Sequence, residues 1–408
     1  MGNRILIAVF LIVLFPGVLA AQSDNYTLSF APDAWYNEVD GIRLGARVLG
    51  EMEGTFQDGP HRLEAGLWVG TAFPDLPVSY YISFTEPISA FSSFGNEGNF
   101  RIQSSIRTGY SRHELSMNKR WQNGFDEFDY HEFTLSFSQE KLFDQEYRPY
   151  PLLWQKEWKS LLGAEYRLSQ NFDLGKFNLN ASFKQNVSEF EGFKVAMVEI
   201  KQQIPLGDKF EFRVRGFTGY TDTENAPEYL FGISYRQPVG WLQNGISRAK
   251  GTLPGSLLDD GLFHVSGHAN LRGYTNAEFR SLSEESFVQY NFVNTINTEF
   301  EFPNFINSAM SGSIISDFVQ LRSYLFADAG NFFRADYELS PGLISDLNEQ
   351  RADAGVGFQF SINIPDYLGN DRGFAIRYEI PFWLSHPEDS ESNFKFRNLI
   401  GIGAVISL

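Results

Sequence analysis

The chain has 408 residues, of which 43% are apolar and 16% aromatic, and it contains 36 glycines and no cysteine. The lack of cysteine excludes a disulfide framework, a thiolate zinc site and a cysteine nucleophile. The 50 acidic and 33 basic residues give a net charge of −17, which argues against nucleic acid as a partner. The many aromatics exclude a disordered acidic chain, and a mean hydropathy of −0.25 excludes a bundle of membrane helices.

The first residues have the pattern of a secretory signal peptide, which we predict to span residues 1–21. Arg4 precedes an apolar run over 5–15, a Pro-Gly pair ends that run, and small residues up to Ala21 offer a cleavage site. A membrane-spanning helix is the alternative, but the run is well short of the roughly 20 apolar residues that a span requires. We therefore expect an exported protein, and we interpret residues 22–40 as a short periplasmic segment.

The remainder of the chain alternates between apolar and polar side chains at every second position, which is the pattern of β-strands. In 176–185, for example, Phe177, Leu179 and Phe183 fall on one face, and lysine, asparagine and serine fall on the other. No window longer than about ten residues has the 3.6-residue period of a helix. The pattern predicts sixteen strands, near 41–50, 63–72, 77–86, 100–109, 111–118, 130–139, 160–169, 175–186, 192–204, 209–221, 228–236, 287–302, 317–330, 351–364, 373–383 and 396–408.

This strand pattern favours an all-β fold, a 16-stranded antiparallel transmembrane β-barrel that occupies residues 41–408. Membrane barrels use even numbers of strands with apolar side chains toward lipid and polar side chains toward the lumen. A soluble β-sandwich or propeller also alternates, but here the aromatic faces have no second sheet of matching apolar faces to cover them. A sheet edge in lipid would leave its backbone polar groups unsatisfied, so such a chain closes on itself.

The longest predicted loop, over about 237–285, carries the string Leu271-Arg272-Gly273-Tyr274, and two strands later come Phe326, Asp328 and Gly330. Together these residues resemble the Omp85/TpsB superfamily, the bacterial surface antigen type of outer-membrane barrel. The resemblance implies that the loop folds into the lumen and that its Arg272 contacts Asp328. It further implies a role in protein insertion, assembly or translocation at the outer membrane.

The alternation supports this pairing independently of the resemblance. It places Asp328 on the lumen side, where a carboxylate in a low-dielectric environment needs a partner. Arg272 is a suitable partner, because its planar guanidinium can pair with a carboxylate through two hydrogen bonds. The alternative is that Arg272 is solvated and that Asp328 pairs with Arg322 on its own strand. Three further carboxylates are predicted to point inward and to be secondary partners, those of Glu299, Glu301 and Asp353.

The C-terminal residues are interpreted as an assembly signal. Gly403, Ile406 and Leu408 resemble the C-terminal pattern that the outer-membrane assembly machinery reads. We also interpret the contact between 41–50 and 396–408 as a weak seam, since glycines in both segments offer little packing. We hypothesise that this seam opens sideways to admit a client strand by β-augmentation.

No catalytic, metal or cofactor motif is found. His264 and His268 are four residues apart but lack the glutamate and the helix of a zinc protease motif, so we expect no enzyme, no metal and no cofactor. The segment 22–40 is too short to form a POTRA domain, which suggests a POTRA-less member of the superfamily.

The sequence therefore predicts a protein of the outer membrane of a Gram-negative-type bacterium, with outer-membrane lipids and the assembly machinery as partners. Its expected role is protein insertion, assembly or translocation. Two alternatives stay open. One is a non-catalytic barrel that anchors or scaffolds a separate periplasmic or surface protein, and the other is a plugged diffusion channel.

Overall fold

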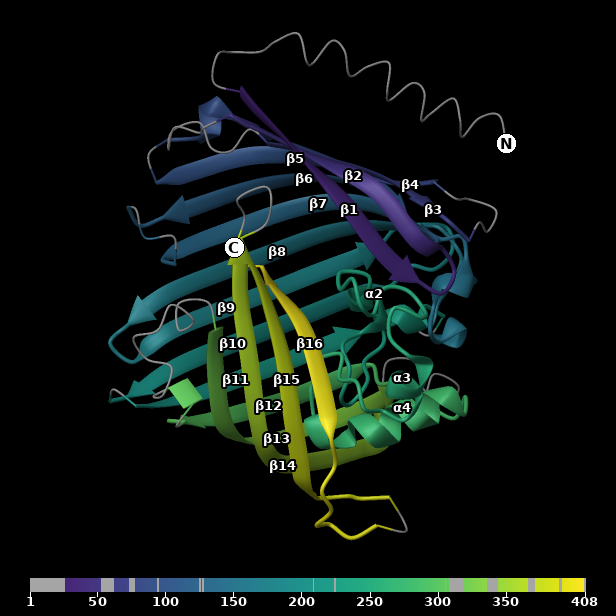
Figure 1. The fold of residues 1–408 in the computed structure, drawn as a ribbon, viewed down its shortest axis with the longest axis vertical. Helices are drawn as coiled ribbons and strands as arrows, with labels where there is room; N and C mark the ends of the chain where they lie inside the picture. The colour runs from purple at the N-terminus through teal and green to yellow at the C-terminus, as the bar shows by residue number, and fades with distance from the viewer. Residues whose placement is uncertain are drawn as a thin grey trace.

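The computed structural model arranges sixteen strands in one antiparallel sheet, in which each strand pairs with its neighbours in chain order. The sheet is rolled into a barrel, as Figure 1 shows. This confirms the predicted fold class. The structure describes residues 26–52, 62–72, 78–93, 95–124, 126, 128–207, 209–223, 225–304, 306–307, 319–335, 344–365, 371–388 and 391–406.

The strands are long enough to cross a bilayer when tilted. They are β1 (Tyr26–Asn37), β2 (Gly41–Met52), β3 (Arg62–Gly70), β4 (Val78–Pro87), β5 (Asn96–Arg107), β6 (Tyr110–Gln122), β7 (Tyr130–Leu142), β8 (Lys159–Phe172), β9 (Gly175–Asn186), β10 (Lys194–Leu206), β11 (Phe210–Thr221), β12 (Phe292–Phe302), β13 (Val319–Ala335), β14 (Ile344–Pro365), β15 (Asp371–Leu384) and β16 (Leu399–Ile406). The α-helices are α2 (Pro238–Trp241), α3 (Gly255–Asp259) and α4 (Thr275–Ser283). Short 3-10 helices are η1 (Ser89–Phe91), η2 (Gln145–Tyr147), η3 (Pro151–Leu153), η4 (Pro227–Tyr229) and η5 (Arg272–Tyr274). Within the described ranges, no helix has the length and apolar character needed to cross a membrane.

Exposure alternates along the strands as the sequence pattern predicts. Leu115 on β6 and Leu135 on β7 are each 50% exposed, and Leu325 on β13 is 49% exposed. Its neighbours Tyr324 and Phe326 are buried on the other side of the sheet. Exposed apolar side chains in such numbers mark a surface that meets something other than water. The outer face of the barrel therefore suits lipid.

The two ends of the barrel differ. One end carries the connection between β11 and β12, whose helices α2, α3 and α4 gather there in Figure 1. This connection, residues 222–291, is called the inner loop here. It packs against the β7–β8 connection through an aromatic cluster in which Trp241 contacts Tyr150 and Phe279 at ring-centroid distances of 6.1 Å each. Burial of such side chains stabilises by about 1.5–3 kcal/mol each, so the inner loop is held firmly.

Two predicted strand positions are wrong, although their number is right. Residues 26–37 form β1, so the barrel begins before residue 41 and the described part of the predicted segment 22–40 belongs to it. This strand was missed because Pro32 interrupts the strand pattern. Proline is tolerated in a strand at the edge of a sheet, and β1 is an edge strand. Residues 228–236 are not a strand but part of the inner loop, buried on both alternating faces because they lie inside the lumen.

The predicted seam is also misplaced. Strand β2, which contains 41–50, pairs with β1 on one side and β3 on the other, so it is not an edge. The edge strands are β1 and β16. Among the described residues no pairing joins these two strands; instead, Ile400 of β16 forms a parallel bridge with Phe263 of the inner loop. The inner loop thus covers part of the β16 edge.

Some predictions fall outside the described part of the chain. The signal peptide over 1–21 and Leu408 lie outside the described residues. The structure describes the backbone of Gly403 and Ile406, but not the side chain of Ile406. The proposed signal peptide and C-terminal assembly signal therefore stay predictions.

Candidate functional site in the barrel lumen

The tip of the inner loop is fixed inside the barrel by apolar packing. Leu271 is fully buried in a cluster that includes Phe217 of β11 and Phe332 of β13. Its backbone N–H donates to the carbonyl of Ile233 at 3.1 Å. The short helix η5 follows directly, so the position of Leu271 sets the direction in which Arg272 leaves the loop.

Arg272 forms a bidentate pair with Asp328 of β13. Its Nε and Nη2 donate to the two carboxylate oxygens at 2.8 Å each, and its backbone N–H donates to Oδ2 at 3.3 Å. Both residues are almost completely buried. A charge-assisted, two-point pair is the strongest kind of side-chain hydrogen bonding that a protein offers. The loop–barrel contact therefore forms, and Arg272 is not a solvated loop residue.

The rest of the Arg272 guanidinium is also occupied. Its Nη1 donates to Glu299 of β12 at 2.8 Å and to Glu379 of β15 at 3.0 Å. The group stacks on the ring of Phe326 at 3.9 Å. Burial alone would lower the pKa of Arg272, but Asp328 and Glu379 raise it well above its ordinary value. Arg272 is therefore a permanent cation that joins a loop to three strands.

Glycines provide the space that this arrangement requires. A Cβ on Gly273 would lie 2.7 Å from the Cβ of Asp353, and a Cβ on Gly355 of β14 would lie 2.3 Å from the Phe326 ring. A Cβ on Gly330 would lie 2.6 Å from the Thr295 side chain. The motif glycines thus allow close approach of loop, ring and strands.

Tyr274 fastens the other side of the loop tip. Its hydroxyl lies 3.2 Å from the carbonyl oxygen of Ala352, to which it donates, and 3.1 Å from the hydroxyl of Ser385. The backbone N–H of His386 donates to the same hydroxyl at 3.3 Å. The loop tip is therefore tied to β14 and to the connection after β15 as well as to β13.

The secondary carboxylates divide into three cases. Glu299 contacts Arg272 as predicted. Glu301 instead accepts from Arg322 at 2.7 Å, which also removes Arg322 as a partner for Asp328. Asp353 is buried opposite Asp328 in the strand register, and its carboxylate oxygens have no hydrogen-bond partner among the described residues.

Sequence reasoning missed Glu379 and Tyr324 as members of the site. Tyr324 donates to Glu379 at 2.7 Å, so the carboxylate that Arg272 reaches on β15 is itself oriented by β13. The alternation does place Glu379 on the inner face of 373–383. Nothing in the sequence, however, shows how far across the lumen the loop tip reaches.

Inside the inner loop, Glu278 of α4 holds the chain together. Its carboxylate accepts from the backbone N–H groups of Ile233 and Ser234 at 2.7 Å each and from the Ser234 hydroxyl at 2.6 Å. Burial raises its pKa to about 7, although these hydrogen bonds lower it. The folded loop therefore favours the protonated form more than a solvated glutamate does.

His268 has the opposite character. Its Nδ1 accepts from the backbone N–H of Gln237 at 3.0 Å, and its ring stacks on Phe217 at 5.3 Å. Burial, together with Arg236 and Arg215, lowers its pKa to about 3. The folded loop therefore holds this imidazole neutral.

Glu278 and His268 are expected to tilt stability in opposite directions with pH. A raised glutamate pKa makes stability fall as pH rises from about 4.5 to about 7. A lowered histidine pKa makes stability fall as pH drops below about 6.5 toward 3. Relative to the parent, we expect Glu278→Gln to lose more stability at about pH 5 than at pH 7, and His268→Asn to lose more at pH 7 than at pH 5, in urea unfolding of the purified protein. Equal slopes in the two variants would contradict these assignments.

The site is suited to holding the inner loop in place rather than to acid–base chemistry. The Arg272 guanidinium is saturated and permanently charged, so it neither donates nor takes up a proton at neutral pH. Within the ranges that the structure describes, no group of three histidine, aspartate or glutamate side chains is placed to hold a metal ion. What the geometry can do is fix the inner loop in the lumen or release it.

Comparison with known proteins yields structural neighbours only. No protein-family model matches the chain, and no curated protein matches it. The structure is similar to BamA from Haemophilus ducreyi lacking POTRA domains 1–3, with 16% identity and a TM-score of 0.46, covering 93% of this chain and 70% of that one. It is also similar to CdiB from Escherichia coli, with 10% identity and a TM-score of 0.45, covering 93% of this chain and 63% of that one.

Proposed function

We propose that this chain is an Omp85-type barrel of the outer membrane of a Gram-negative-type bacterium that inserts, assembles or translocates proteins there. The observation that carries the proposal is the pairing of Arg272 with Asp328. It joins the inner loop after β11 to strand β13, which is the arrangement that the sequence resemblance implies. The apolar outer face of the strands supports a membrane location.

In this proposal the inner loop and the barrel edge act together. The backbone N–H of His264 donates to the carbonyl of Ile400 at 2.9 Å, and the N–H of Ile400 donates to that of Leu262 at 2.7 Å. The loop that carries Arg272 thus occupies hydrogen-bonding positions on the β16 edge. A client strand that pairs with β16 needs the same positions. Release of the loop is therefore the step that makes the edge available to a client.

The proposal is tested by capture from native membranes. A tagged full chain, purified after cross-linking in cells, is expected to retain unfolded precursors of other outer-membrane barrels. A version in which Phe263 and Ile400 are replaced by cysteines and oxidised to a disulfide is expected to retain far fewer. Because the chain has no cysteine of its own, the reduced form of the same variant is the matched control. Capture of one fixed protein, equal in both forms, would contradict the proposal and favour an anchoring role.

A plugged diffusion channel is the second candidate, because a cavity of about 1080 Å³ lies inside the barrel beside the inner loop. Deletion of residues 262–284 removes the loop tip and the edge contact together. We expect it to raise conductance in planar bilayers strongly, while Arg280→Ala, a change at an exposed loop position, leaves conductance unchanged. A conductance that the deletion does not alter would show that the loop does not close the lumen.

A further inference from the structure

The lumen contains a cationic chamber in a strongly acidic protein. The cavity of about 1080 Å³ is lined by twelve arginines and lysines but only four glutamates and no aspartate, whereas the whole chain has a net charge of −17. Strands supply one wall of this chamber and the inner loop supplies the other. A concentration of one sign of charge in a low-dielectric recess attracts the opposite sign.

Half of these cations form no ion pair among the described residues, although more distant carboxylates act on some of them, as Glu199 does on Arg236 and Glu379 on Arg377. Arg112, Arg167 and Arg215, for example, form ion pairs within the barrel wall. Among the described residues, six lining cations form no ion pair: Arg101, Arg107, Lys184, Arg236, Arg248 and Arg377. Buried or half-buried charges are normally paired, so the excess of cations over carboxylates in this lining would be offset by a bound anion.

Arg248 shows the imbalance most clearly. It belongs to the inner loop, and its Nε donates to the carbonyl of Leu242 at 2.6 Å. Burial together with the charges of Arg107, Arg43 and Arg148 lowers its pKa to about 9. Arg107 contacts the ring of Tyr81 at 4.9 Å rather than an acid. An anion bound in this part of the chamber would offset the repulsion that Arg248 experiences from these arginines.

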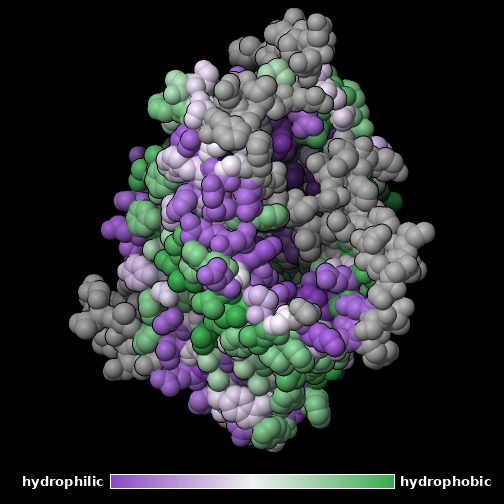
Figure 2. Space-filling model, turned by 90° about the vertical axis from the view of Figure 1, so that its left-hand side faces the viewer, coloured by the Kyte–Doolittle hydropathy of each residue, from purple (hydrophilic) through white to green (hydrophobic). Residues whose placement is uncertain are grey.

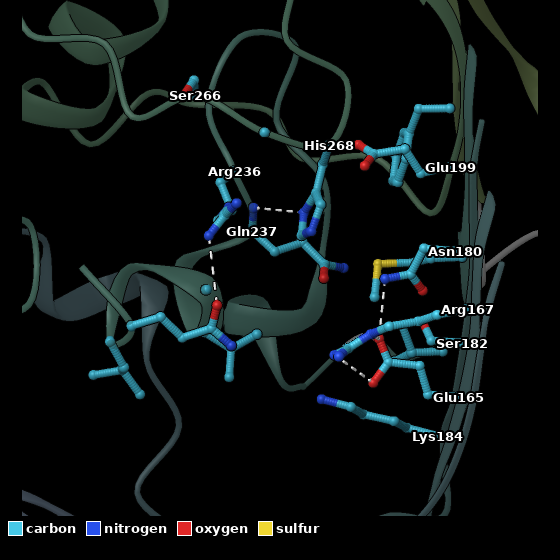
Figure 3. A pocket seen from close by; sticks show the side chains of 18 of the residues that line it. Glu165, Arg167, Asn180, Ser182, Lys184, Glu199, Arg236, Gln237, Ser266 and His268 are labelled. Carbon is cyan, nitrogen blue, oxygen red and sulfur yellow. Dashed lines mark hydrogen bonds and ion pairs between the residues drawn. The ribbon is translucent and has the colours of Figure 1, made fainter. Parts of the chain in front are cut away.

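Lys184 and Arg236 form a second group across the chamber. Figure 3 shows Lys184 on the strand wall and Arg236 on the inner loop, both pointing into the same space. The side-chain hydrogen bond of Arg236 is a long one, 3.5 Å to Gln243. His268 lies beside them, held neutral by burial and by the nearby cations. An anion here would meet donors from both walls.

We infer that this chamber binds an extended acidic peptide segment. The inference deepens the proposed function, on which it rests, because it names the class of polypeptide that enters the lumen. The unpaired cations lie on β5, β9, β15 and the inner loop rather than converging on one point, which suits carboxylates spaced along a chain. Amide and hydroxyl groups, such as those of Gln103, Asn180 and Ser182, also line the chamber and can bond a peptide backbone.

The route of entry favours a ligand from water over a lipid. Strands β5 to β12 are paired without a break, so lipid has no path through this wall. The chamber reaches Arg167, Lys201 and Arg213, which stand a few residues from the turns at the end opposite the inner loop. Figure 2 faces that end, where hydrophilic side chains border part of a recess in the surface. A peptide can enter there.

The test measures binding of a fluorescent oligo-glutamate peptide to the purified full chain in detergent. Oligo-glutamine and oligo-lysine peptides serve as controls, and inorganic polyphosphate and glycerol phosphate are compared as phosphate ligands of free and lipid-headgroup type. The variants are Arg107→Gln/Arg248→Gln and Lys184→Gln/Arg236→Gln. Arg280→Gln, which removes an exposed cation outside the chamber, is the matched control. Resistance of the native barrel to unfolding in cold detergent, seen on gels, verifies that each variant folds.

Saturable binding of oligo-glutamate alone is expected, weakened about tenfold or more in either double variant, as for the loss of charge-assisted hydrogen bonds. Arg280→Gln is expected to bind as the parent does. Absence of saturable binding, equal binding by the double variants, or tighter binding of either phosphate ligand would overturn the inference. Capture of precursors without peptide binding would defeat this inference alone. Peptide binding without capture would defeat the proposed function alone.

Discussion

Replacing Arg272 with alanine is expected to lower the free energy of unfolding by about 3–5 kcal/mol, the cost of breaking a buried ion pair from one side. The reason is that one guanidinium serves three carboxylates. Asp328 and Glu379 are almost wholly inaccessible to solvent, and Glu299 is only partly accessible. Without Arg272 these charges repel one another in the lumen, and the loop tip loses its ionic contacts with β12, β13 and β15. Urea unfolding of the purified barrel measures the loss.

Two control variants separate this effect from a general loss of charge. Arg280→Ala removes an exposed ion pair with Glu388, which is worth about 1 kcal/mol or less. Arg272→Lys keeps the charge but not the two-point geometry, so it is expected to recover only part of the stability. A loss in Arg272→Ala no larger than that in Arg280→Ala would contradict the stabilising role of the Arg272 ion pairs.

A double-mutant cycle isolates the pair itself. The three carboxylates around Arg272 make a simple charge swap unsuitable, because a new aspartate at position 272 would face Glu299 and Glu379. Asp328→Asn removes one charge with little change of shape. We expect Arg272→Ala and Asp328→Asn to be non-additive, with a coupling of about 1–3 kcal/mol, as for residues in one ionic network. Additive losses would show that the pairing contributes nothing of its own.

The second large effect is expected at Gly355. A Cβ at this position would lie 2.3 Å from the Phe326 ring and 2.5 Å from the carbonyl oxygen of Ile380. The ring cannot retreat easily, because Arg272 stacks on it at 3.9 Å. Gly355→Ala is therefore expected to destabilise the barrel by about 1–3 kcal/mol or more, the cost of overpacking a close-packed interior, and to loosen the inner loop.

A matched control for Gly355 exists on β11. A Cβ on Gly216 would meet nothing within 4 Å, and glycine is a poor strand residue. Gly216→Ala is therefore expected to be neutral or slightly stabilising. Unfolding in urea and the rate of limited proteolysis of the inner loop measure both variants. Similar behaviour of the two alanines would contradict the close approach of Phe326 to β14.

The fold class was predictable because it depends on a repeated local pattern. Alternation along fifteen segments identifies strands that the structure contains, and their polar faces identify the lumen side. The pattern fails where the environment changes. The edge strand β1 contains Pro32, which interrupts the strand pattern, and the stretch 228–236 is largely buried in the lumen, so it lacks the exposed face that the pattern assumes.

The central pair of the site was predictable, but its surroundings were not. A loop arginine and an inward aspartate two strands later suggest each other because a buried carboxylate needs a cation. The sequence does not show how deep in the lumen the loop tip lies. Arg272 contacts Glu379 on β15 because of this depth, so the contact could not be predicted. The unpaired cations of the chamber were missed for the same reason, since they come together only after the loop folds inward.

Trp68 illustrates the same limit. Its mid-strand position on the polar face of β3 has no explanation in the sequence. In the structure its ring covers Gly45 and Gly66, where a Cβ would lie within 2.3 Å and 2.2 Å of it. Its Nε1 donates to Asp33 of β1 at 2.7 Å. The tryptophan therefore joins three strands, and it could not be understood while β1 was interpreted as a separate segment.

The most direct test of the account is the rate at which an unfolded outer-membrane barrel becomes protease-resistant in proteoliposomes that contain the purified chain. We expect a rate clearly above that of empty liposomes, and a lower rate when the Phe263→Cys/Ile400→Cys variant is oxidised, restored on reduction. A rate equal to that of empty liposomes, or one unaffected by fixing the inner loop to β16, would contradict it.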